Sequence, residues 1–88
     1  SAELVNEGRI VAAGSLADQG RLADAIRLLE KGWKAPKRPK DVHLRRAYAL
    51  ADLLERAGSI PRARQLFAWL SNAAPGFADV DARLRALG

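Results

Sequence analysis

The sequence predicts an all-α protein, and three observations support this fold class. The 88-residue chain is 49% hydrophobic and 28% charged, is rich in Ala, Leu and Arg, and holds only one Tyr and two Phe, which agrees with a single helical domain. Its apolar residues recur at helical spacing over long stretches. A short pattern, Leu-x-x-x-Gly-x-(Leu/Ile)-x-x-Ala, begins at Leu16 and again at Leu54, 38 residues later. A repeat of this length indicates stacked helical hairpins.

The first half of the chain predicts two helices separated by a glycine. The first helix covers about residues 3–18 and ends at Gly20, and the second covers about 21–33 and fades at Gly32, because glycine readily takes the conformations that terminate helices. The apolar faces comprise Leu4, Val5, Val11, Ala12 and Leu16 in the first helix and Leu22, Ala25, Ile26, Leu28 and Leu29 in the second.

A loop is expected over residues 34–40, where two prolines and four cations break the helical pattern. The next helix covers about residues 42–57, with Asp41 as its N-cap and Gly58 at its end.

The last part of the chain predicts two more helices. One covers residues 60–73, since Ser59 and Pro61 form a favourable helix start and Ala74-Pro75-Gly76 breaks the pattern. The tail, about residues 77–87, resembles a short capping helix. It has Ala78, Val80, Leu84 and Leu87 on one side, with Asp79, Asp81, Arg83 and Arg85 among the others.

The repeated pattern resembles the tetratricopeptide repeat, a helical hairpin of 34 residues. In the second copy, the positions that carry the resemblance are Leu50, Ala51, Leu54, Gly58, Ala63, Phe67 and Pro75; in the first copy they are Ala12, Ala13, Leu16, Gly20, Ala25 and Leu29. The family favours Trp where this chain has Ala47 and Ala where it has Leu70. A plain helical bundle with coincidental spacing is the alternative.

The resemblance implies one domain over residues 1–88, a TPR-like α-α superhelix. Repeat 1 would cover about 6–39, an inserted basic loop 34–40, repeat 2 about 44–77 and a capping helix 77–87. Such a domain implies a non-enzymatic scaffold or adaptor that binds a peptide or protein in a concave groove lined by the first helix of each hairpin. The groove positions are Glu7, Ile10 and Gly14 in the first repeat and Arg45, Tyr48, Asp52 and Glu55 in the second. These side chains could also form an ordinary solvated face with short-range ion pairs.

The positive charge is concentrated in residues 31–46, which carry a net charge of +6. The whole chain carries +5, so the remaining residues sum to about −1. The candidate anion-binding residues are Lys31, Lys34, Lys37, Arg38, Lys40 and Arg46. Together with Trp33, they could bind phosphates of a nucleic acid such as RNA, or an anionic membrane surface. The alternative is that lysines merely keep a long loop solvated.

Other chemistry has little support in the sequence. The chain has no cysteine, so disulfides and thiolate metal sites are excluded, in agreement with a cytoplasmic location. The single histidine, His43, lacks a partner constellation, so we expect no catalytic residue, no metal and no cofactor. Trp33 and Trp69 are expected to be packing residues. No segment has the length of a membrane span. The absence of methionine favours a piece of a longer repeat protein, and exposed repeat ends favour self-association.

Overall fold

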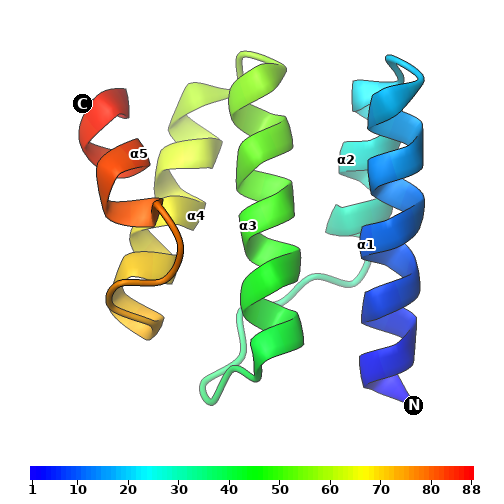
Figure 1. The fold of residues 1–88 in the computed structure, drawn as a ribbon, viewed down its shortest axis with the longest axis horizontal. Coiled ribbons are helices and arrows are strands. Elements are labelled where there is room, and N and C mark those ends of the chain that lie inside the picture. The colour runs from blue at the N-terminus through cyan, green and yellow to red at the C-terminus, as the bar shows by residue number, and fades with distance from the viewer.

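The computed structural model describes all 88 residues and confirms the all-α fold class, with five helices and no strand. The helices are α1 (Ala2–Asp18), α2 (Leu22–Glu30), α3 (Asp41–Arg56), α4 (Ile60–Ala73) and α5 (Val80–Leu87). They form two layers: α1, α3 and α5 lie in front, and α2 and α4 lie behind (Figure 1). Helix α3 is central, packing against α1, α2 and α4, while α5 packs against α4.

The turns inside the two hairpins close in the same way. Gly20 and Gly58 both have positive φ, +78° and +83°, a conformation that costs a residue with a side chain about 1–2 kcal/mol. Directly after each glycine, a backbone N–H donates to the carbonyl five residues back, Arg21 to Leu16 at 2.9 Å and Ser59 to Leu54 at 2.8 Å. This bonding satisfies the last carbonyls of α1 and α3, so the repeated sequence pattern corresponds to a repeated local structure.

The core lies where α3 meets its neighbours, and it alternates small and large side chains. Its best-buried small residues are Ala13, Ala25, Ala47, Ala51 and Ala63, and its largest fully buried side chains are Leu29, Phe67, Leu70 and Val80. Ala51 and Ala63 therefore lie at close helix contacts. Gly58 does not: it is exposed, and a Cβ placed there would meet nothing within 4 Å. Its backbone conformation, rather than space, explains the glycine.

Three predicted helix boundaries are wrong. Helix α2 ends at Glu30 and not at residue 33, because the chain leaves the helical conformation at Lys31 and Gly32 has a positive φ of +68°. Helix α5 begins at Val80 and not at residue 77, because Gly76 and Ala78 have positive φ. The N-cap of α3 is Lys40, whose backbone N–H donates to His43 Nδ1 at 2.9 Å.

Candidate functional site

Two of the predicted groove residues, Glu7 and Arg45, meet at the seam between α1 and α3. Arg45 on α3 forms an ion pair with Glu7 on α1, and its Nε donates to Asp41 at 2.8 Å. Lys40 pairs with Glu3 across the same seam at 2.7 Å. These cations lower the pKa of the Glu7 and Glu3 carboxyls. The structure thus brings Glu7 and Arg45 together, although in contact with each other rather than free.

The remaining groove residues on α3 gather around one arginine of α5. Arg83 donates to the Tyr48 hydroxyl at 3.2 Å and lies 2.9 Å from Asp52 Oδ1 and 3.1 Å from Glu55 Oε1. Its guanidinium carbon also lies 5.7 Å from the Tyr48 ring centroid, within cation–π range. Burial alone would lower the pKa of Arg83, but its hydrogen bonds to Tyr48, Asp52 and Glu55 raise this pKa overall. The Tyr48 hydroxyl donates to Asp79, and this bond, with partial burial, raises the pKa of the phenol.

Two hollows lie along the α1–α3 seam: a polar one of about 460 Å³ beside the Glu3–Lys40 and Glu7–Arg45 ion pairs, and a smaller, more apolar one. The volume of the smaller hollow is about 220 Å³, and Ile10, Gly14, Ala49 and Leu53 line its apolar part. Ile10 is half-buried and Gly14 is exposed. Polar groups stand at its edge, where Asp52 and Arg56 form an exposed ion pair at 3.4 Å. The seam therefore combines a small apolar hollow with ion pairs that face solvent.

Arg46 was predicted to be part of an anion-binding loop, and its position corrects that prediction. Only 5% of the residue is exposed. Its guanidinium donates to the carbonyls of Leu29 and Lys31 and to Asn6 Oδ1, with donor–acceptor distances of 2.6–2.9 Å. Arg9 donates to the same Lys31 carbonyl at 2.7 Å. Arg46 is thus a structural cap for the end of α2, and burial lowers its pKa.

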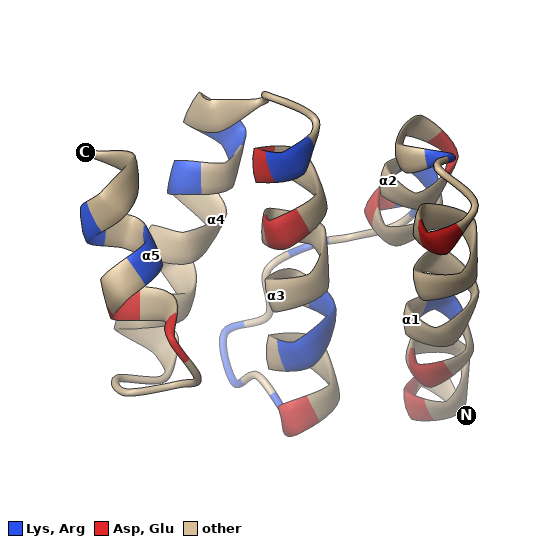
Figure 2. Ribbon diagram, turned by 45° about the horizontal axis from the view of Figure 1, so that its top comes forward, with Lys and Arg blue, Asp and Glu red and all other residues tan.

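The other predicted loop cations differ in their surroundings. Lys31, Lys34, Lys37 and Arg38 are exposed and form no ion pair. They follow the loop that leads from α2 to α3 (Figure 2). Lys40, in contrast, forms an ion pair with Glu3. Four unpaired cations therefore remain on the loop, and whether they bind anions stays a prediction.

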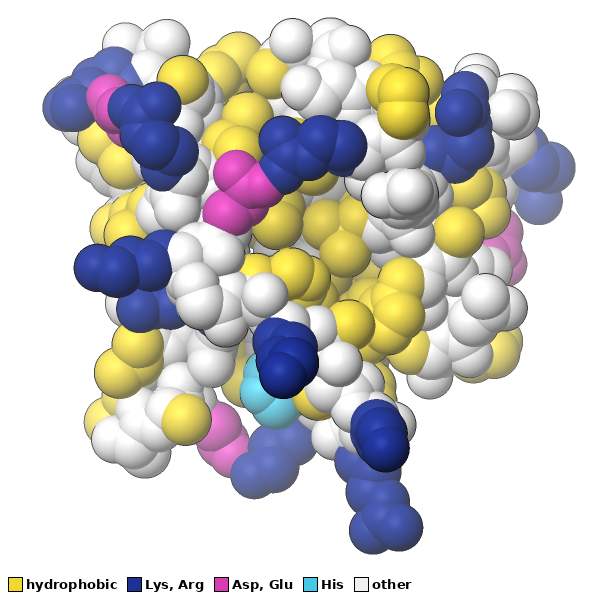
Figure 3. All heavy atoms as spheres, turned by 180° about the vertical axis from the view of Figure 1, so that it is seen from behind, with side chains coloured by type: hydrophobic (Ala, Val, Ile, Leu, Met, Phe, Trp, Pro, Cys, Tyr) yellow, Lys and Arg dark blue, Asp and Glu magenta, His cyan; other side chains and the backbone are white.

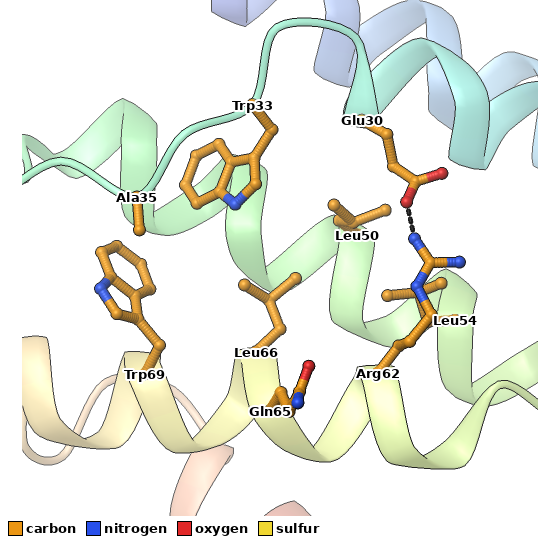
Figure 4. Close-up of a pocket in the computed structure, with 9 residues that line it drawn as sticks. All are labelled: Glu30, Trp33, Ala35, Leu50, Leu54, Arg62, Gln65, Leu66 and Trp69. Atoms are coloured by element: carbon orange, nitrogen blue, oxygen red, sulfur yellow. Dashed lines mark ion pairs between the residues drawn. The ribbon is translucent and has the colours of Figure 1, made fainter.

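The most apolar concave surface lies on the opposite side of the molecule, between α2 and α4 (Figure 3). We call it the tryptophan hollow. Its volume is about 330 Å³, and its apolar lining consists of Trp33, Ala35, Leu50, Leu54, Leu66 and Trp69. The two indole rings meet edge to face, with centroids 5.7 Å apart. An ion pair between Glu30 and Arg62 spans one end (Figure 4).

Sequence reasoning missed this hollow, having treated both tryptophans as packing residues. They do pack, but each is only partly buried and lines open space. The available signal was that the chain's only two tryptophans lie near the ends of the second helix of each hairpin. No group of three or more potential ligands is placed to hold a metal, and none of the helices is both long and apolar enough for a membrane span.

Comparison with models of known protein families yields no match, and neither curated proteins nor solved structures yield one. The fold and site define a small all-α domain with two helical hairpins and a fifth helix packed on α4. The likeness to tetratricopeptide repeats is an interpretation of residue spacing.

Proposed function

We propose that the protein is a non-enzymatic interaction module that binds a peptide or protein segment along the α1–α3 seam. The observation that carries the proposal is the open hollow of Ile10, Gly14, Ala49 and Leu53 between ion pairs exposed to solvent. Exposed ion pairs contribute only about 0.2–1 kcal/mol each. A bound segment can therefore exchange them for its own charged groups at little cost, while its apolar side chains enter the hollow.

The test uses a peptide display library and a substitution that fills the hollow. Gly14 lines the hollow, and a Cβ placed on it would meet nothing within 4 Å, so Gly14→Gln adds bulk without a clash. Gly8→Gln is the matched control, because Gly8 lies on the same helix with equally open surroundings and outside the hollow.

Peptides selected on the unmodified protein should bind Gly14→Gln at least about tenfold more weakly and Gly8→Gln unchanged, as fluorescence anisotropy would measure. Filling the hollow removes apolar contacts worth about 1.4 kcal/mol or more, and that energy corresponds to a factor of ten. Equal affinity of every selected peptide for both variants would refute binding at the seam.

A second candidate function is nucleic-acid binding through the loop, and the four unpaired cations Lys31, Lys34, Lys37 and Arg38 favour it. Binding of a single-stranded oligonucleotide should then weaken with salt, with a logarithmic slope of about −0.7 for each phosphate contacted. Absent or salt-independent binding would eliminate this candidate. The cytoplasm is the compartment that we propose for either function.

Self-association is a further part of the proposal. Helix α1 exposes Leu4 and Val11, each 72% accessible, and Val5, which is 54% accessible. A second copy of the chain could cover this surface. A molar mass by light scattering that stays monomeric at all concentrations would contradict it.

A further inference from the structure

The tryptophan hollow lies where α2 ends and the loop to α3 begins. Helices α2 and α4 both lie behind α3 (Figure 1), but α2 stops at Glu30 and the chain continues as a loop without regular structure until Asp41. The buried side chains of Leu50 and Leu54 on α3 form part of the lining, and Trp33 and Trp69 stand on its sides. Trp33 and Trp69 are only partly buried, so part of this apolar lining stays in contact with solvent.

The hollow extends past Trp69 into a second concavity. This neighbour has a volume of about 520 Å³, and it shares Ala35 and Trp69 with the tryptophan hollow. Two loop prolines and Lys37 line it on one side and the end of α4 on the other. The two concavities together offer a length of surface rather than a single closed pocket, which suits a chain segment better than a small molecule.

The charge around this surface is strongly one-sided. Lys37 lines the second concavity, and Lys34 and Arg38 lie beside it in the loop, all exposed and without an ion pair. The only carboxylate in the lining of either concavity, Glu30, is already paired with Arg62. An occupant that carries negative charge would therefore meet unpaired cations and no free anion.

We propose that the tryptophan hollow docks a protein segment in which a bulky apolar side chain is flanked by carboxylates. The apolar side chain enters beside Trp33 and Trp69, and the carboxylates face the loop cations. This surface is separate from the α1–α3 seam, so it adds a second binding surface on the opposite side of the molecule. Buried apolar anchors with a charged rim are the usual anatomy of such contacts.

The aromatic geometry favours a protein segment over a nucleic acid. Single-stranded nucleic acids bind by stacking bases on open aromatic faces. Here the Trp33 ring packs edge to face with Trp69, and the Arg46 guanidinium carbon lies 5.4 Å from its centroid. Arg46 is itself held by the end of α2, so this face of the indole is already covered.

Intrinsic fluorescence gives a direct assay, because both tryptophans of the chain lie in the hollow. The peptide library, made without tryptophan, would be selected on the Gly14→Gln variant, whose seam is blocked. Selected peptides should combine acidic residues with Phe, Leu or Ile, and they should change the tryptophan emission to saturation.

Two variants and a control complete the test. Lys37→Glu should lower the affinity of the selected peptides at least about fivefold, because the reversed charge removes one attractive contact with a carboxylate and adds a repulsion. Ala35→Glu places a carboxylate in the lining that the two concavities share, and it should lower the affinity of the peptides at least as much. Arg85→Glu, on the exposed and unpaired arginine of α5, should change nothing.

Three results would overturn the proposal: no peptide selected, selected peptides without acidic residues, or equal loss of affinity in Lys37→Glu and Arg85→Glu. Displacement of the peptides by oligouridylate at lower concentration than by the acidic peptide itself would instead assign the surface to nucleic acid. These peptides are selected on the Gly14→Gln variant, so a negative result leaves the proposal of binding at the α1–α3 seam intact. Conversely, if Gly14→Gln does not weaken the peptides selected on the unmodified protein, the proposal for the tryptophan hollow is unaffected.

Discussion

Replacing Arg46 with methionine should strongly destabilise the fold. Methionine keeps most of the aliphatic length but removes every donor of the guanidinium. The carbonyl of Leu29 would lose two donors, at 2.9 and 2.6 Å, and Asn6 Oδ1 would lose one at 2.7 Å. The Lys31 carbonyl would keep its bond from Arg9.

The magnitude follows from these orphaned acceptors. Each buried acceptor left without a partner costs about 1–3 kcal/mol, while removal of a buried cation recovers part of its desolvation cost. The expected loss in the free energy of unfolding is about 2–4 kcal/mol, which for a domain of this size lowers Tm by roughly 10–25 °C. Urea denaturation followed by circular dichroism would measure the loss.

Arg45→Met is the matched control, one residue away on the same helix. Arg45 is 42% exposed at its side chain and forms ion pairs only with Glu7 and Asp41, so its loss should cost much less than the loss of Arg46. If the two variants unfolded within about 0.5 kcal/mol of each other, the reasoning on buried capping would be refuted.

Two further predictions concern the hairpin turns and the single tyrosine. Gly58→Ala should destabilise by about 1–2 kcal/mol because φ there is +83°, whereas Gly14→Ala, in open helical surroundings, should stabilise by up to about 1 kcal/mol; equal effects in urea denaturation would contradict this. Asp79→Asn should lower the pKa of Tyr48 towards 10.0, and Arg83→Met should raise it further, because Asp79 raises this pKa and the bond from Arg83 lowers it. The raised pKa means that the contribution of Tyr48 to stability is complete below pH 10 and is lost as the pH rises through the folded-state value. Ultraviolet absorbance of the chain's only tyrosine would measure the titration, and shifts in the same direction in both variants would contradict the assignment.

Local signals predicted most of the fold. Helix α4 has the predicted bounds because Ser59 and Pro61 mark its start and Pro75 follows its end. Those residues act through their own backbone, so a sequence contains all the information that they use.

Features that depend on distant residues were not predictable in this way. The cap of α2 is one such feature, because Arg46 lies 17 residues after Leu29, whose carbonyl it binds. The prediction that Arg46 is an anion-binding cation of the loop assumed that its charge faces solvent, whereas it binds backbone carbonyls. The tryptophan hollow is another, because its lining combines residues of the loop, α3 and α4 that meet only in the folded chain. Glu7 and Arg45 were both assigned to one face, but sequence spacing could not show that they would bind each other.

The position of Arg46 also bears on how the chain folds. Helical repeats often fold almost independently, with stability passed between neighbours through apolar contacts. Here the carbonyl of Leu29 in α2, and that of Lys31 just beyond it, receive donors from Arg46 of α3, which belongs to the next hairpin. The cap of α2 therefore comes from the second hairpin. Removal of α3 should destabilise α2, so the stability of the first hairpin depends in part on a polar contact with the second.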